Sequence, residues 1–172
     1  MIVDLTGLFD NGKTTHSLKG EINALDLKFS DYNIELLGPI VYDGMIYKVN
    51  DYYSLDLKIN YGIKTECNRC LKTVEEDVKT QLFGKLVDHN VELQSEEEDL
   101  EEPIYLEKNT LDLRKYILEQ VVSSIPLKII CSEDCKGLCQ TCGVDLNNES
   151  CNCDDNIIDP RLEKLKELFP DQ

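Results

Sequence analysis

The sequence predicts an α+β protein that is mainly β: an antiparallel sheet or open barrel covered by one helix, then a cysteine-rich C-terminal segment with a short terminal helix. Three observations support this fold class. Apolar and polar residues alternate with a period of two over much of the first 87 residues, one later segment has helical spacing, and eight cysteines occur in short-spaced couples. Alternation is typical of strands with one buried and one wet face.

The clearest predicted strand covers residues 53–63, where every second side chain is apolar. Leu25, Leu27 and Phe29 alternate similarly, and a weaker alternation extends from residue 74 to residue 87. Asp43-Gly44 lies between two apolar triplets and predicts a hairpin turn, because both residues tolerate positive φ. The apolar positions of the clearest strand are Tyr53, Leu55, Leu57, Ile59, Tyr61 and Ile63.

The remaining elements are one loop and two helices. Residues 88–102 carry a run of acidic side chains that cannot be buried together, which predicts a solvated loop. A helix is expected over about 110–125, capped by Asn109 or Thr110 and stopped by Pro126, and we expect it to cover the sheet. Asp159-Pro160 predicts the start of the short terminal helix. We expect a β-rich domain over residues 1–130 and a metal-binding segment over 131–172.

Metal binding is predicted from the cysteines. Two cysteines separated by two residues can chelate one tetrahedral ion from a tight turn, and eight thiols are the number that two closed four-sulfur zinc sites require. We therefore expect one or two structural Zn²⁺ ions, with iron–sulfur clusters, disulfides or buried free thiols as alternatives. The candidate ligands are Cys67, Cys70, Cys131, Cys135, Cys139, Cys142, Cys151 and Cys153.

Spacing alone leaves the pairing of these couples open. Our first choice joins Cys67 and Cys70 to Cys131 and Cys135, so that the remaining four cysteines close a second, local site. The rival choice pairs the two C-x2-C turns with each other, as in a zinc ribbon. Either arrangement is saturated by sulfur, and a closed site stabilises a protein without offering a position for substrate.

Cations lie close to the cysteines along the chain. We expect them to offset thiolate charge, with a small basic binding patch as the alternative. They are Lys64, Arg69, Lys72, Lys128 and Lys136.

Composition excludes several classes of function. The net charge of −16 opposes broad affinity for nucleic acid, so direct RNA contact is disfavoured and a basic protein partner is favoured. The sequence contains no glycine-rich phosphate loop and no nucleophile elbow, and we expect no enzymatic activity. No apolar run is long enough to cross a bilayer, and residues 1–10 carry no secretory signal, so we expect a cytoplasmic protein without a membrane partner.

Two stretches resemble a known family. Residues 66–71 (ECNRCL) resemble the E-C-x-R-C-L signature of the YceD-like family, the large ribosomal RNA subunit accumulation proteins. Residues 131–147 (CSEDCKGLCQTCGVDLN), with the later Cys-Asn-Cys and Asp-Pro-Arg-Leu strings, resemble the tail of its Gram-positive members. The resemblance implies a cytoplasmic bacterial protein with a role around ribosome assembly. It implies no mechanism and no catalytic residue.

Two hypotheses for function follow. The first is a non-enzymatic factor that supports accumulation of large-subunit ribosomal RNA by binding a ribosomal protein or a pre-ribosomal particle, with structural zinc. The second is a redox-responsive zinc-thiolate protein, in which oxidation of the thiolates expels the metal.

Overall fold

The computed structural model describes residues 1–10, 12–23, 33–88 and 103–153. Contacts divide the chain into two units. The first combines Met1–Thr65 with Val74–Lys128, and the second combines Glu66–Thr73 with Ile129–Gln172. The turn that carries the first cysteine couple therefore groups with the cysteine-rich segment, although more than fifty residues separate them in sequence.

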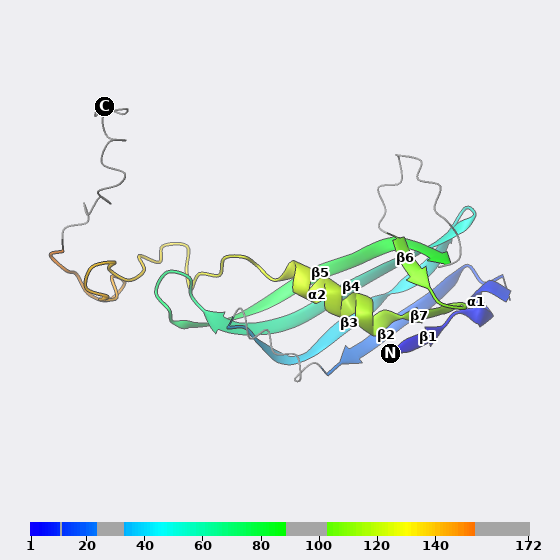
Figure 1. Ribbon diagram of the computed structural model, residues 1–172, viewed down its shortest axis with the longest axis horizontal. Helices are drawn as coiled ribbons and strands as arrows, with labels where there is room; N and C mark the ends of the chain where they lie inside the picture. Colours follow the sequence, from blue (N-terminus) through cyan, green and yellow to red (C-terminus); the bar gives the residue numbers. More distant parts are fainter. Residues whose placement is uncertain (11, 24–32, 89–102, 154–172) are drawn as a thin grey trace, which may run out of the picture. The chain divides into compact units, whose positions relative to one another are not determined.

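The first unit is built on a five-stranded sheet in the order β2-β3-β4-β5-β6 (Figure 1). Strand β2 pairs antiparallel with β3, and β3 pairs antiparallel with β4, as expected. Strand β6 instead pairs parallel with β5, so the prediction of a wholly antiparallel sheet was wrong at this edge. A parallel neighbour requires a crossover of about a dozen residues, and residues 89–102 separate the two strands. The strands are Thr15–Ile22 (β2), Glu35–Val49 (β3), Tyr52–Glu66 (β4), Thr73–Asp88 (β5) and Pro103–Leu106 (β6).

Strand β4 contains the segment predicted as the clearest strand, and its alternation has the expected cause. Leu55, Leu57, Ile59 and Ile63 are fully buried, whereas Lys58 and Asn60 are exposed. Strand β5 covers the weaker alternation that follows the first cysteine couple. That couple lies in the turn between β4 and β5.

The hairpin predicted at Asp43-Gly44 was wrong, because both residues lie inside the long strand β3. Gly44 pairs with Leu18 on one side and Leu57 on the other. A side chain at Gly44 would collide with the backbone oxygen of Asp56, so glycine is required here for close strand packing. The chain reverses further on, between β3 and β4, where Asn50 adopts a φ of 51°.

Helix α2 (Leu113–Ser124) confirms the predicted helix but begins later than expected. Residues Thr110–Asp112 form strand β7, which pairs antiparallel with β1 (Ile2–Asp4), so neither Asn109 nor Thr110 caps the helix. The short helix α1 (Thr6–Asp10) follows β1. Residues 109–112 contain residues that can cap a helix, but Thr110–Asp112 form a strand because they pair with β1.

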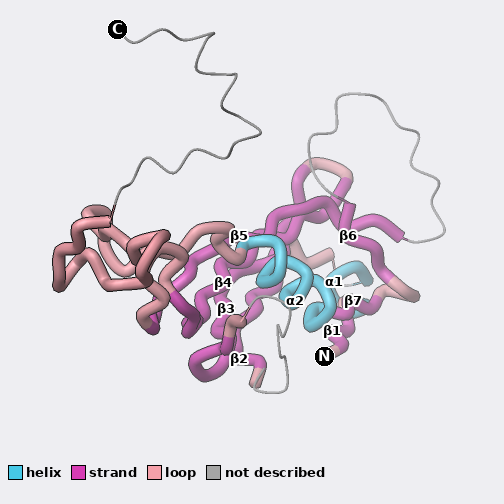
Figure 2. Tube along the Cα trace, turned by 60° about the vertical axis from the view of Figure 1, so that its left-hand side comes forward, coloured by secondary structure: helices cyan, strands magenta, loops and turns pink. Residues whose placement is uncertain are grey.

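Helix α2 packs against the sheet through a buried apolar face formed by Leu113, Ile117 and Val121 (Figures 1 and 2). The Tyr61 hydroxyl of β4 donates to the Val121 carbonyl at 3.2 Å. The Gln120 amide donates to Thr80 of β5 at 2.8 Å. The helix therefore covers β4 and β5, which places the core between α2 and the sheet.

Three predicted features lie outside the described residues: the alternation of Leu25, Leu27 and Phe29, the acidic run after Asp88, and the terminal helix from Asp159. Neither helix in the described part of the chain combines the length and apolar character needed to span a bilayer.

Candidate metal centres

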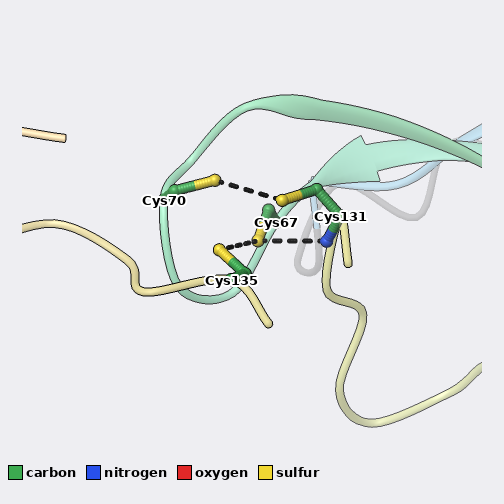
Figure 3. A group of neighbouring side chains, drawn as sticks. All are labelled: Cys67, Cys70, Cys131 and Cys135. Carbon is green, nitrogen blue, oxygen red and sulfur yellow. Dashed lines mark hydrogen bonds between the residues drawn. The ribbon is translucent and has the colours of Figure 1, made fainter. Parts of the chain in front are cut away.

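The first four-sulfur cluster combines Cys67 and Cys70 with Cys131 and Cys135 (Figure 3). All four sulfur atoms lie within 4.8 Å of one another. The Cys67 and Cys135 sulfurs are 3.9 Å apart, and those of Cys70 and Cys131 are 3.6 Å apart. Cys67, Cys70 and Cys135 are buried, whereas Cys131 is exposed.

Paired hydrogen bonds place the two halves of this cluster side by side. The backbone N–H of Asn68 donates to the Ile129 carbonyl at 2.8 Å, and the Ile129 N–H donates to the Asn68 side-chain oxygen at 2.7 Å. The Arg69 guanidinium donates to the carbonyls of Glu133 and Cys135 at 3.2 and 2.7 Å. The turn after β4 is thereby fixed against the chain that carries Cys131 and Cys135.

The second four-sulfur cluster consists of Cys139, Cys142, Cys151 and Cys153, again with all sulfurs within 4.8 Å. It is more accessible than the first, because only Cys139 is buried and Cys142 is exposed. Both clusters have the composition of our first-choice pairing. The rival pairing of the two C-x2-C turns in one site does not match these groups.

The two C-x2-C turns share one backbone conformation. In the first, the Leu71 N–H donates to the Cys67 carbonyl at 3.0 Å, and the Cys67 N–H donates to the Lys72 carbonyl at 2.8 Å. The second repeats both bonds at 2.9 Å, from Gly143 to Cys139 and from Cys139 to Val144. The residue after the second cysteine has positive φ in each turn, 59° at Leu71 and 75° at Gly143.

The clusters fit a tetrahedral metal ion. Zinc–sulfur bonds of about 2.3 Å in a tetrahedron imply sulfur–sulfur distances of roughly 3.8 Å, close to the 3.6 and 3.9 Å in the first cluster. A disulfide requires a bond of about 2.05 Å, and all eight cysteines are free thiols. Four sulfurs per cluster match a structural site and leave no vacant coordination position.

Backbone N–H groups prepare one thiol of each cluster for metal. Burial opposes ionisation of Cys67, but N–H groups of Arg69, Cys70 and Cys131 lower its pKa to about 6. The distances from the Cys67 sulfur to the Arg69 and Cys131 nitrogens are 3.4 and 3.3 Å. N–H groups of Cys142 and Thr141 similarly lower the pKa of Cys139 to about 6.

Other thiols have raised pKa values, because adjacent sulfurs repel one another when they are all charged and no cation is present. The neighbouring Cys135 and Cys70 raise the pKa of Cys131 to about 12. Cys142 and burial raise the pKa of Cys153 to about 12. Each cluster thus holds one thiol with a lowered pKa and two thiols with raised pKa values, and the latter two would lose their protons when a cation binds.

Two of the predicted cations, Lys72 and Arg69, have specific partners. Lys72 forms an ion pair with Asp145 at 2.8 Å, and this carboxylate raises the pKa of Lys72. Arg69 is bound to backbone carbonyls, as described above. Sequence reasoning missed Asp145 and also Asn147, whose amide donates to the Cys135 sulfur at 3.6 Å. Both lie between the two couples of the second cluster, where polar residues are typical of a loop and give no sign of a contact with the first cluster.

The described chain thus belongs to the class of proteins that combine a β-rich unit with two clusters of four cysteines, each able to hold a metal ion. Residues 55–169 match the family described as Large ribosomal RNA subunit accumulation protein YceD, and the chain belongs to this family.

Curated relatives support the assignment. An uncharacterized protein of Mycobacterium tuberculosis is 35% identical over 107 residues, covering 60% of this chain and 49% of the relative. An uncharacterized protein of Mycobacterium leprae is 30% identical over 139 residues, covering 79% of this chain and 62% of the relative. The Zea mays protein named Large ribosomal RNA subunit accumulation protein YCED homolog 1, chloroplastic, is 38% identical over 60 residues, covering 34% and 20%.

The chain spans about half the length of the first mycobacterial relatives that it matches. No solved structure matches it.

Proposed function

We propose that this chain is a non-enzymatic factor that supports accumulation of large-subunit ribosomal RNA, with a Zn²⁺ ion held by each of its two cysteine clusters. The observation that carries the proposal is the match of residues 55–169 to the YceD family, whose description names that role. Clusters closed by four sulfurs suit a structural rather than a catalytic metal. The metal-binding segment is proposed to extend over 131–172 and to use the Cys67–Cys70 turn.

The proposed partner is a basic ribosomal protein or a pre-ribosomal particle, met through protein contacts in the cytoplasm. The net charge of −16 favours a basic partner and opposes phosphate. The cations of the first cysteine turn do not form a free basic patch, because Arg69 binds carbonyls and Lys72 pairs with Asp145. Direct RNA contact through this turn is therefore disfavoured.

The first unit offers a contact surface for such a partner. A cavity of about 350 Å³ lies between α2, β5 and β6, and Phe83 and Tyr105 at its lining are each 41% exposed. Exposed aromatic side chains beside polar groups are typical of interface anchors. Glu119 on the same lining supplies negative charge for a basic partner.

The function is tested in cells that lack this chain. We expect large-subunit ribosomal RNA to fall relative to small-subunit RNA, and to recover with the wild-type chain. Cys67→Ser should fail to restore it, whereas Ser132→Ala, at an exposed position in the same unit, should restore it. An unchanged ratio of the two RNAs in the deletion strain would overturn the proposed function.

The metal is tested by elemental analysis of the full chain. We expect two zinc ions per wild-type chain and one each for Cys67→Ser and Cys142→Ser. Loss of all zinc in either variant would indicate one shared centre, and a wild type without zinc would refute the metal assignment.

The contact with ribosomal proteins is tested by affinity capture before and after ribonuclease treatment. Ribosomal proteins that stay bound after ribonuclease support protein contact, and Tyr105→Ala should weaken their capture. Complete loss after ribonuclease would refute protein contact.

A redox-responsive zinc-thiolate protein is the second candidate, favoured by the exposure of Cys131 and Cys142. Mild peroxide should then release zinc, followed with a colour indicator, and reductant should permit reloading. Retention of both ions under peroxide would exclude this function.

A further inference from the structure

The loop between the inner cysteines of the second cluster also contacts the first cluster. This loop, residues 143–150, is bounded by Cys142 and Cys151. From it, Asp145 pairs with Lys72, two residues after Cys70, at 2.8 Å. The Asn147 amide nitrogen donates to the Cys135 sulfur at 3.6 Å. A segment whose ends belong to one cluster therefore provides hydrogen-bonding and ionic partners to the other.

Asn147 is held in this position from several sides. Its side-chain oxygen accepts the Lys136 N–H at 2.8 Å, so the amide nitrogen is oriented towards sulfur. Asp145 accepts from the Asn147 backbone N–H at 3.0 Å and from its side-chain nitrogen at 2.6 Å. The Leu146 N–H donates to the Gly137 carbonyl at 3.0 Å, which fixes the loop to the short connection between Cys135 and Cys139.

We propose that loop 143–150 couples the two metal sites so that they load cooperatively, with Asn147 as a positioning residue for the Cys135 sulfur. An ion in the second site fixes both ends of the loop through Cys142 and Cys151. The loop then holds Asp145 and Asn147 against the first site. This inference rests on the proposed function, because it requires an ion in each cluster.

Thermodynamic linkage requires the coupling between the two metal sites to be reciprocal. If the second ion raises the affinity of the first site by a given factor, the first ion raises the affinity of the second by the same factor. Hydrogen bonds to metal ligands from outer groups typically change metal affinity by about 10- to 100-fold. We expect coupling of about tenfold or more.

The first experiment measures Zn²⁺ affinity of the full chain by competition with a chromophoric chelator. In Cys142→Ser/Cys151→Ser, only the first site remains, and we expect it to bind at least tenfold more weakly than in the wild type. In Cys67→Ser/Cys70→Ser, the second site should weaken by a similar factor. First-site affinity that is unchanged without the second site would overturn the coupling.

The second experiment removes the coupling residue. Asn147→Ala should weaken the first site by about tenfold or more and should largely abolish the dependence on the second site. The matched control is Asn148→Ala, because Asn148 donates to Asp145 at 2.9 Å rather than to sulfur. An equal effect of the two substitutions would overturn the role of Asn147.

A spectroscopic measurement separates positioning from a general loss of structure. With Co²⁺ bound in both sites of the full chain, loss of the N–H donor to the Cys135 sulfur should move the sulfur-to-cobalt charge-transfer band to lower energy. Asn147→Asp keeps the side-chain size but removes the donor, and should shift the band as Asn147→Ala does. An unshifted band in both variants would refute the hydrogen bond to Cys135.

The outcomes distinguish the two proposals. A wild type that binds two ions independently refutes the coupling and leaves the metal assignment intact. A wild type that binds fewer than two ions refutes both.

Discussion

Gly137 is the position at which one added methyl group should most clearly disturb the first metal site. It has a φ of 78°, and a side chain there would place Cβ 2.9 Å from the Arg69 carbonyl oxygen and 3.3 Å from the Arg69 Cβ. That carbonyl accepts the Leu138 N–H at 3.0 Å, so moving it away breaks a hydrogen bond between the first cysteine turn and the following chain. The site cannot relieve the collision without loosening the cluster.

The magnitude of the Gly137→Ala effect has two parts. A left-handed backbone costs an alanine about 1–2 kcal/mol, and the forced contact adds about 1–2 kcal/mol. Because metal binding and folding are linked, a total of about 2–4 kcal/mol corresponds to roughly 30- to 1,000-fold weaker zinc binding. The assay is zinc competition with a chromophoric chelator, with circular dichroism to check that the β-rich unit remains folded.

Gly143→Ala provides the control. Gly143 has a similar φ of 75°, but nothing lies within 4 Å of the added Cβ. Only the backbone cost of about 1–2 kcal/mol applies, or roughly 5- to 30-fold weaker binding. Equal losses in the two variants would refute the argument that Gly137 is required by its approach to Arg69.

Four further predictions follow from the same structure. Leu71→Gly should strengthen zinc binding by up to about fivefold, because glycine adopts the φ of 59° without the strain that this exposed leucine carries; weaker binding would contradict this. Tyr61→Phe should lower the free energy of unfolding by about 1–2 kcal/mol in urea, because the hydroxyl bonds Val121 and Ser124; an unchanged value would contradict it. Each ion should displace at least two protons at pH 7, because two thiols per cluster have raised pKa values, so apparent affinity should fall by about two log units per pH unit on acidification. Calorimetry in buffers of different ionisation enthalpy measures this release, and fewer than two protons per ion would refute it. Removal of metal by EDTA should abolish hydrogen-exchange protection in the second unit while β4 stays protected, and protection that persists in both would refute the structural role of metal.

The alternation of apolar and polar residues was sufficient to predict a strand where burial of one face determines the secondary structure. Strand β4 alternates because one face packs under α2, and this signal is present in the sequence itself. Asp43-Gly44 has the sequence of a turn, but Gly44 serves the close approach of β3 to β4. Residues 110–112 were predicted as part of the helix, because their actual partner, β1, lies more than a hundred residues earlier and leaves no local signal in the sequence. Both errors arise from contacts between residues distant in sequence.

The same distinction applies to the metal centres. Cysteine spacing predicted which residues could bind metal from tight turns, and a positive φ at Gly143 closes one of these turns. The grouping of the clusters depends on the paired hydrogen bonds between Asn68 and Ile129, for which neither residue carries a sequence signal. Asn147 was missed for a related reason, because its contact with Cys135 depends on the fold of its loop.

The second unit requires a source of stability other than a hydrophobic core. Apart from cysteines, Ile129 is the one apolar side chain classed as buried in its described part. Burial of one isoleucine contributes about 1.5–3 kcal/mol, far less than the entropy cost of ordering this length of chain. Structural zinc contributes about 10–16 kcal/mol per site in small zinc-binding domains. Two such ions would supply what burial cannot, and the cysteines that bind them would take the place of a core in this unit. The proposed mutual support of the clusters through loop 143–150 would then be a condition for folding as well as for metal affinity.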